Sequence, residues 1–202
     1  SETSETLTEL MHHMTSYGAA GIKITSSADL TRDTNRMRVC RAAIPDGPPF
    51  IIDLYGTVEN AASTLPEARK WEDFNMLWLE DPFEFDDYPN LMELADGLPY
   101  RVGVGDEHTG LRHFQRLIEQ GHISVLRLDA TAAGGVRGFI EAAKMAAAHN
   151  VPVSTHVYHF LHTQLAAAVP NVKYVEYMLP ESNAESIHLL MNAALNWDNG
   201  RL

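Results

Sequence analysis

One pattern is repeated seven times along this sequence: a short apolar or β-branched run, then a turn, then an amphipathic stretch of helical period. Such runs predict strands, and strict alternation of strands with helices implies parallel strands joined by helical crossovers. Thr6 and Glu9 form a capping-box pattern at the start of the first helix. The predicted strands are residues 21–25, 50–53, 76–80, 101–106, 124–129, 151–156 and 173–177, and the predicted helices are 6–17, 31–43, 58–73, 88–96, 111–120, 136–149, 161–168 and 184–195.

Two architectures fit this alternation, an open doubly wound sheet and a (β/α) barrel. A nucleotide-binding open sheet would need a glycine-rich turn after its first strand, and the turn here reads TSSADL. Functional groups of a barrel sit at the C-terminal ends of several different strands, around one mouth. The strand ends described next favour an α/β TIM-type barrel. No linker or composition shift interrupts the 202 residues, so we expect one domain, 1–202.

All seven predicted strands end at or near an ionisable residue. A single acid at a strand end often caps the next helix or meets solvent. Capping alone would favour Ser, Thr and Asn equally, so a run of this composition is better explained by side chains facing one cavity. The residues are Lys23, Asp53, Glu80, Asp106, Asp129, His156 and Glu176.

Three consecutive members of this set, Asp53, Glu80 and Asp106, are carboxylates. They would repel one another strongly in a barrel mouth unless a cation lay between them. Hard oxygen ligands without a thiolate suit Mg²⁺. In the string MLWLEDP, strand alternation points Glu80 inward, and we expect Asp81 to turn away and cap the loop before Pro82.

The remaining members suggest proton transfer next to a carboxylate. An Asp one strand before a His can hold the imidazole tautomer and raise its basicity, which is the arrangement of Asp129 and His156. Lys23 would approach a metal-bound substrate from the opposite face. This two-base arrangement around a Lewis acid suits removal of an α-proton, with the metal stabilising the enediolate.

These residues resemble the enolase superfamily, mandelate racemase branch, in its C-terminal barrel portion. The matching strings cover the chain from about Gly18 to Tyr177, and their order and spacing carry the resemblance: IKI, IIDLYG, WLEDP, VGDE, RLDATAAGGVRG, VPVSTH, and HTQLAAAVPN followed by YVEY.

The resemblance implies a role for each matching position. Glu107 is a rival to Asp106 as the third metal ligand, and we favour Asp106. The implied magnesium ligands are Asp53, Glu80 and Asp106; the implied catalytic residues are Asp129, His156 as general acid or base, and Lys23 as the opposite-face base; and Glu176 is implied to hydrogen-bond the carboxylate end of the substrate.

Three departures from the family pattern stand out. Gly21 replaces the first lysine of the Lys-x-Lys motif, which makes Lys23 a poorer base or an electrostatic anchor. Tyr55 stands where the family often has Asn or His, and we expect its side chain to point towards the same mouth and either donate to the substrate or narrow the pocket. The capping domain and the first barrel strand have no counterpart here, so we expect a fragment of a longer enzyme whose specificity is largely unreadable. His108, just past Asp106, is a candidate pocket residue.

Composition limits the partners. The net charge of −12 argues against nucleic acid or an anionic membrane surface. The single cysteine, Cys40, rules out an internal disulfide and suits a cytoplasmic location, and we expect it in the core. His159 and His162 follow His156 at helical spacing, but without a cysteine a zinc site is disfavoured.

We therefore expect a Mg²⁺-dependent lyase acting on a sugar acid, a dehydratase that removes the α-proton and then the β-hydroxyl. A racemase or epimerase, or a cycloisomerase of a lactone or anhydro sugar acid, would use the same intermediate. The alternative from another class is a catalytically incompetent barrel fragment with a structural role. A homo-oligomer is the expected assembly.

Overall fold

The computed structural model describes residues 2–120 and 122–179. Its contacts divide the chain into two compact units, one ending at Val102 and one beginning at Gly103, and each is described by itself. The predicted helix 184–195 lies outside the described residues. The prediction of a single domain stays a prediction.

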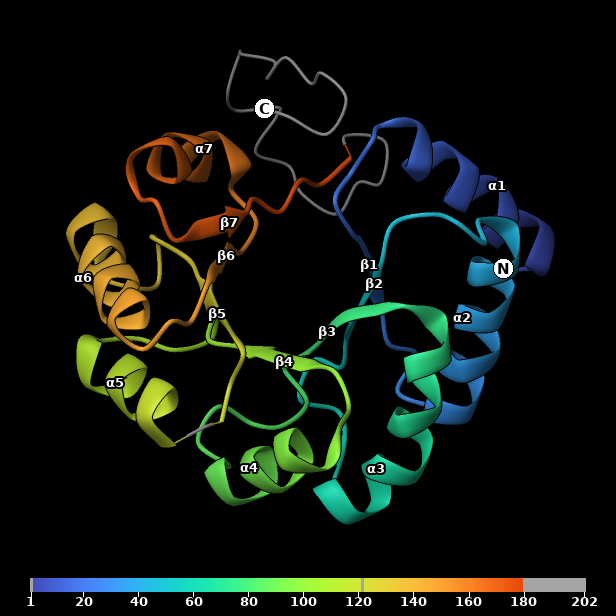
Figure 1. Cartoon of the computed structure of the whole chain (residues 1–202), viewed down its shortest axis with the longest axis horizontal. Helices are drawn as coiled ribbons and strands as arrows, with labels where there is room; N and C mark the ends of the chain where they lie inside the picture. The colour runs from blue at the N-terminus through green and yellow to red at the C-terminus, as the bar shows by residue number, and fades with distance from the viewer. Residues whose placement is uncertain (1, 121, 180–202) are drawn as a thin grey trace. The chain divides into compact units, whose positions relative to one another are not determined.

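The first unit repeats a strand-then-helix order (Figure 1). Parallel strands β1, β2 and β3 are hydrogen-bonded neighbours in chain order. Its elements are α1 (Ser4–Ser16), β1 (Ile22–Thr25), α2 (Leu30–Ala43), β2 (Phe50–Asp53), α3 (Ala61–Ala68), the 3₁₀-helix η1 (Arg69–Phe74), β3 (Met76–Glu80), α4 (Tyr88–Gly97) and the start of β4 (Arg101–Val104).

The second unit continues the same order. Strands β4, β5, β6 and β7 are again parallel neighbours in chain order. A doubly wound open sheet reverses its strand order at a switch point, and neither unit contains such a reversal. Its further elements are α5 (Leu111–Gln120), β5 (Val125–Leu128), α6 (Gly135–Ala148), β6 (Val153–Thr155), α7 (His159–Ala168) and β7 (Val172–Tyr174).

The fold class is therefore an incomplete (β/α) barrel, with seven strands among the residues that the structure describes. All four residues of β2 and of β5 are buried, because parallel strands covered by helices have no solvent face. In the same described part of the chain, no helix has the length and apolar character needed to cross a bilayer.

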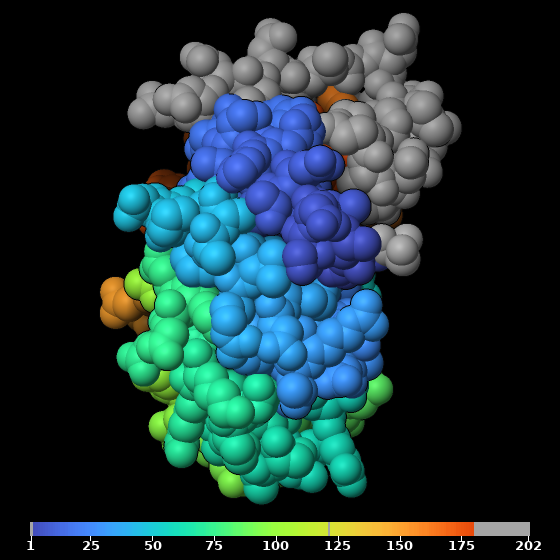
Figure 2. Space-filling view, turned by 90° about the vertical axis from the view of Figure 1, so that its right-hand side faces the viewer, coloured from blue at the N-terminus to red at the C-terminus, as the bar shows by residue number. Residues whose placement is uncertain are grey.

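Helices α1 and α2 pack against each other and form part of the outer face of the first unit (Figure 2). Cys40 on α2 is fully buried, as predicted, and burial raises the pKa of its thiol to about 11. The predicted capping box was misplaced by three residues. The cap is Thr3, whose hydroxyl accepts a hydrogen bond from the backbone of Thr6 while the Thr6 hydroxyl accepts one from the backbone of Thr3.

The predicted helix 58–73 is two elements in the structure. It begins at Ala61, where the side chain of Asn60 accepts a hydrogen bond from the backbone N–H of Ser63. Pro66 lies inside α3 and removes one backbone donor, and the chain tightens into a 3₁₀-helix from Arg69.

Candidate metal and proton-transfer site

Asp53 and Glu80 lie side by side at the ends of two neighbouring strands of the first unit. The register of β2 and β3 pairs these two residues directly. Asp53 is buried, and Glu80 is 0% exposed. Two carboxylates so close in a buried place require positive charge nearby.

Lys23 of β1 supplies positive charge to both. Its Nζ lies 2.9 Å from Glu80 Oε1 and 3.3 Å from Asp53 Oδ2. This placement fits the electrostatic anchor among the roles expected of Lys23. A Cβ at Gly21 would lie 3.0 Å from Leu77 Cδ2, so a side chain at this position, where the family pattern has another lysine, would require Leu77 to shift.

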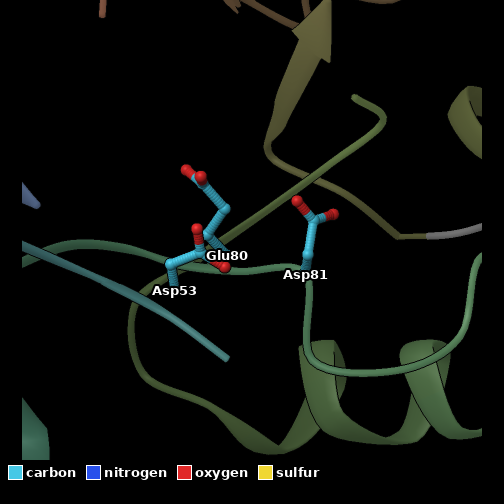
Figure 3. A group of neighbouring side chains, drawn as sticks. All are labelled: Asp53, Glu80 and Asp81. Atoms are coloured by element: carbon cyan, nitrogen blue, oxygen red, sulfur yellow. The ribbon is translucent and has the colours of Figure 1, made fainter. Parts of the chain in front are cut away.

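The structure corrects the prediction for the orientation of the Asp81 side chain. We expected its side chain to turn away, but it offers a carboxylate oxygen to the cluster with Asp53 and Glu80, and these ligand atoms lie within 4.8 Å of one another (Figure 3). The cause is local backbone geometry, because Asp81 has φ 39. A left-handed residue after the strand breaks the alternation that would send the next side chain to the opposite face.

The donor set of this cluster fits a hard divalent cation. It consists of carboxylate oxygens from Asp53, Glu80 and Asp81, without sulfur or imidazole. The three acids together outweigh the one positive charge of Lys23, and a divalent ion would balance that excess. Mg²⁺ keeps several waters in its octahedral shell, so carboxylate ligands of this kind leave positions for water or substrate.

Trp78 fixes Glu80 from the buried side. The two residues lie on the same face of β3, two positions apart, and the indole Nε1–H donates a hydrogen bond of 2.7 Å to Glu80 Oε2. With Oε1 on Lys23, each oxygen of Glu80 has a defined partner. Strand alternation predicted that Glu80 points inward, but the support from Trp78 was not predicted.

The second unit contains the predicted Asp129–His156 pair. His156 Nδ1 lies 3.2 Å from Asp129 Oδ2. Because a carboxylate can only accept, Nδ1 carries the proton in this contact. Asp129 Oδ1 accepts two further hydrogen bonds of 2.8 Å from the backbone and hydroxyl of Thr131.

The surroundings of His156 and Asp129 shift the pKa of each residue in the direction that favours its charged form. Burial lowers the pKa of His156, but the hydrogen bond with Asp129 and the charges of Asp106 and Glu176 outweigh it, so the pKa is raised. Burial raises the pKa of Asp129, but its hydrogen bonds with His156 and Thr131 outweigh it, so that pKa is lowered. The imidazole is therefore held as a group that accepts and keeps a proton readily.

Asp106 and Glu176 share a cation that the sequence analysis missed. Arg127 is almost fully buried, and its Nη2 lies 2.8 Å from Glu176 Oε2 and 3.9 Å from Asp106 Oδ2. Its Nη1 donates to Ser154 Oγ at 2.9 Å and to the carbonyl of Thr155. The available signal was alternation, since Arg127 precedes Asp129 by two residues and so lies on the same face of its strand.

Tyr55 and His108, both expected near a substrate, have defined surroundings in the structure. The Tyr55 side chain is 65% exposed, and its backbone N–H donates to Asp53 Oδ1 at 3.1 Å. His108 is buried in the second unit, with its ring centroid 6.4 Å from that of Phe114. Their roles toward a substrate stay predictions. Glu107, the rival ligand, is exposed in the loop after β4.

The disfavoured zinc site has no support in this geometry. His162 Nε2 accepts from the backbone N–H of Ala130 at 3.0 Å, and Nδ1 lies 2.8 Å from the carbonyl oxygen of Val157. Both ring nitrogens are therefore occupied by backbone groups, which leaves no lone pair for a metal.

Comparison with known sequences decides the family. The profile described as "Enolase C-terminal domain-like" matches residues 6–202. The chain belongs to this family. The enolase superfamily resemblance stated from the strand-end residues is thereby confirmed, and so is its assignment to the C-terminal barrel portion.

Curated relatives of this enolase-family chain include enzymes of two reaction types. This chain is 26% identical over 186 residues to the L-talarate/galactarate dehydratase of Salmonella typhimurium. The matched region covers 92% of this chain and 45% of the dehydratase. It is 26% identical over 150 residues to the 3,6-anhydro-alpha-L-galactonate cycloisomerase of Streptomyces coelicolor, covering 73% of this chain and 41% of that enzyme. The chain thus spans less than half the length of these relatives.

A solved structure supports the same fold. The L-talarate dehydratase of Polaromonas sp. JS666, complexed with Mg and L-glucarate, superposes with a TM-score of 0.81 at 25% identity, covering 88% of this chain and 49% of that one. This enolase-family chain therefore shares its fold with an enzyme that was crystallised with magnesium and a sugar acid.

Proposed function

We propose that the protein carrying this chain is a Mg²⁺-dependent sugar-acid dehydratase. The observation that carries the proposal is the Asp129–His156 contact of 3.2 Å, which gives the chain a proton-transfer group of raised pKa. The acid cluster at Asp53 and Glu80, and the relatives that act on sugar acids, support the same conclusion.

The proposed ligands are Asp53, Glu80 and Asp106, with Asp81 as a further acid beside the first two. Asp106 comes from the family resemblance. A divalent cation bound there supplies charge balance for the substrate carboxylate and for the dianion left when the α-proton departs.

His156 is proposed to move the proton. Asp129 holds Nδ1–H, which leaves Nε2, 3.6 Å from Asp106 Oδ2, as the nitrogen that can take a proton. For dehydration, protonated His156 gives its proton to the departing β-hydroxyl, so that the C–O bond breaks and water leaves. The enol that remains becomes a 2-keto-3-deoxy acid by taking up a proton at C3 while its enol oxygen releases one.

Lys23 is proposed as the opposite-face base or as an electrostatic anchor, and its ion pairs with Asp53 and Glu80 favour the anchor. A Lys23→Arg variant separates the two roles, because arginine keeps the positive charge but does not release a proton at neutral pH. Retained α-proton exchange assigns the anchor role; lost exchange in a folded variant assigns the base.

Glu176 is proposed to bind the carboxylate end of the substrate, with Tyr55 and His108 lining the pocket. Arg127 and the backbone N–H of Val157 both donate to Glu176 Oε2 at 2.8 Å, which orients this side chain. The predictions of a cytoplasmic location and of a homo-oligomer stay predictions.

The deciding experiment is a screen of the whole protein with Mg²⁺ in D₂O against a library of aldonic and aldaric acids. NMR would follow deuterium at the α-carbon and the appearance of a keto-deoxy product. We expect a dehydration product from at least one acid, and its loss in His156→Asn. An exposed control, His149→Asn, should react as the parent does.

The other reactions give different results in the same screen. Deuterium exchange with epimerised but intact substrate would indicate a racemase or epimerase. Turnover of an anhydro sugar acid would indicate the cycloisomerase, which the Streptomyces relative favours. A whole protein that neither exchanges the α-proton nor binds Mg²⁺ would contradict the enzyme proposal and leave the structural role.

A further inference from the structure

His162 of α7 bridges the two loops that carry Asp129 and His156. Its side chain is 0% exposed. Nε2 accepts a hydrogen bond of 3.0 Å from the backbone N–H of Ala130, the residue that follows Asp129. Nδ1 lies 2.8 Å from the carbonyl oxygen of Val157, the residue that follows His156. One ring thus contacts the backbone directly beside both members of the pair.

These two contacts fix the protonation state of His162. A backbone N–H can only donate, so Nε2 must present its lone pair to Ala130, and the proton must be on Nδ1, where it is donated to Val157. Protonation of Nε2 would set two N–H groups against each other. Burial lowers the pKa of His162 and outweighs the contributions of the Val157 carbonyl and of Asp129, which agrees with a neutral ring.

The loop after His156 needs such a contact. Val157 has φ 35 and Tyr158 has φ 38, a left-handed conformation that is costly for a β-branched residue and is kept only where the surroundings hold it. The Val157 peptide groups are held on both sides: its N–H donates to Glu176 Oε2 at 2.8 Å, and its carbonyl accepts from His162.

We propose that His162 is a positioning residue for the Asp129–His156 pair, acting as a neutral clamp between the Ala130 and Val157 backbones. Its Nε2 also lies 3.6 Å from Asp129 Oδ1, so the ring limits how far that carboxylate can move. The catalytic consequence rests on the proposed function, because the pair moves a proton only if the enzyme proposal is right.

A packing role alone makes a different prediction. The His162 ring stacks on Phe139, with centroids 5.7 Å apart and planes at 24°. A phenylalanine at this position would keep an aromatic ring against Phe139, slightly larger than the imidazole, but lose both hydrogen bonds. His162→Phe therefore separates packing from clamping.

Two amide variants divide the clamp into its halves. The side-chain amide of His162→Asn reaches about as far as Nδ1 and can still donate to Val157. The longer side chain of His162→Gln can offer its oxygen where Nε2 accepts from Ala130. His149→Asn, an exposed histidine of the same unit, is the matched control.

The first readout is hydrogen exchange of the Ala130 amide, measured on the whole protein by NMR. We expect faster exchange in His162→Phe and His162→Asn than in the parent, with His162→Gln close to the parent. The second readout is steady-state kinetics on the sugar acid that the screen identifies. There we expect kcat to fall about ten- to a hundredfold in the same order, with KM nearly unchanged, because misplacing a catalytic group costs rate and not substrate binding.

Folded His162→Phe with a protected Ala130 amide, or with the kcat of the parent, would overturn the proposal. If that variant does not fold, the order of the Asn and Gln variants decides in the same way. If the parent turns over no sugar acid, the proposed function fails, and the Ala130 exchange order alone then confirms or contradicts the clamp.

Discussion

Arg127 and Glu176 form a buried ion pair of 2.8 Å in the second unit. Both side chains are almost entirely shielded from solvent, and Asp106 lies 3.9 Å from the same guanidinium nitrogen. Arg127 therefore balances negative charge on Asp106 and Glu176, whose proposed roles come from the family resemblance and do not involve Arg127. Of the two acids, Glu176 makes the closer contact with Arg127, and Asp106 also lies 3.6 Å from His156 Nε2.

Replacement of Arg127 by methionine should strongly destabilise the protein. Removal of one partner of a buried pair leaves the other charge without compensation, which costs about 3–5 kcal/mol. Urea unfolding of the parent and Arg127→Met would measure this. The exposed Arg137, paired with Glu141 on α6, is the control, and Arg137→Met should cause no measurable change. Equal small effects of both substitutions would contradict the central role of Arg127.

Loss of the Trp78 donor should cost more than loss of a comparable donor elsewhere. Trp78→Phe leaves an oxygen of the buried Glu80 carboxylate without its indole partner, and hydrogen bonds to charged groups contribute about 1.5–3 kcal/mol. Trp71→Phe removes a neutral bond of 2.7 Å to Thr34 Oγ1 and should cost about 0.5–1.5 kcal/mol beyond the shared change in volume. Chemical denaturation of the two variants tests this order.

Magnesium should raise the melting temperature of the parent by binding the folded state only. Stabilisation follows RT ln(1 + [L]/Kd), about 2.7 kcal/mol at a hundredfold excess over Kd. We expect Asp53→Asn and Glu80→Gln to abolish the Mg²⁺-induced shift, and the exposed Glu93→Gln to keep it. Persistence of the shift in both variants of the acid pair would mean that the ion binds elsewhere.

The third ligand can be identified by the same titration. The family resemblance implies Asp106, whereas the structure groups Asp81 with Asp53 and Glu80. We expect Asp106→Asn to reduce the Mg²⁺-induced shift more than Asp81→Asn, because a direct ligand contributes more than a neighbouring charge. The reverse order would assign the third position to Asp81.

Acidification should destabilise the protein through His162. Its pKa in the folded state is lowered, so below the ordinary value of about 6.5 the unfolded chain binds a proton that the folded chain does not. The contribution of neutral His162 to the free energy of unfolding is therefore fully present above about pH 6.5. It is lost as the pH falls below that value, by no more than about 1.4 kcal/mol per pH unit. The stability difference between the parent and His162→Gln should narrow from about pH 7 to pH 5. A His149→Gln profile that runs parallel to the parent is the control.

The strand and helix order could be predicted because it depends on hydrophobic periodicity, which survives in any one sequence. The ends were less certain. Strand 101–106 stops at Val104, since Gly105 has φ 142 and leaves the extended region. Thr6 was predicted as the cap because Thr6 and Glu9 match the usual capping-box pattern, whereas the observed box at Thr3 has a threonine, Thr6, in the place of the usual Glu or Gln.

The site could be predicted as a set of residue types at strand ends, but not in its contacts. Asp81 joins the acid cluster through a left-handed backbone angle, which a non-glycine residue seldom has and the sequence does not announce. In the sequence Arg127 is one charged residue in an apolar run. Its role in balancing charge depends on Asp106, 21 positions earlier, and Glu176, 49 positions later. His162 likewise binds backbone groups, which carry no sequence signature.

The bond between Trp78 and Glu80 gives the protein an internal indicator. The fluorescence of an indole is sensitive to the hydrogen bond and the electric field at its nitrogen. The Trp78 nitrogen donates its hydrogen bond to the carboxylate of Glu80, which we propose as a metal ligand. Any ion that draws charge from Glu80 would weaken this bond and shift the emission of Trp78. Trp71, bonded to a neutral hydroxyl, would not respond in this way. Binding of an ion to the acid cluster should therefore be measurable as a shift in the tryptophan emission wavelength, without an added dye.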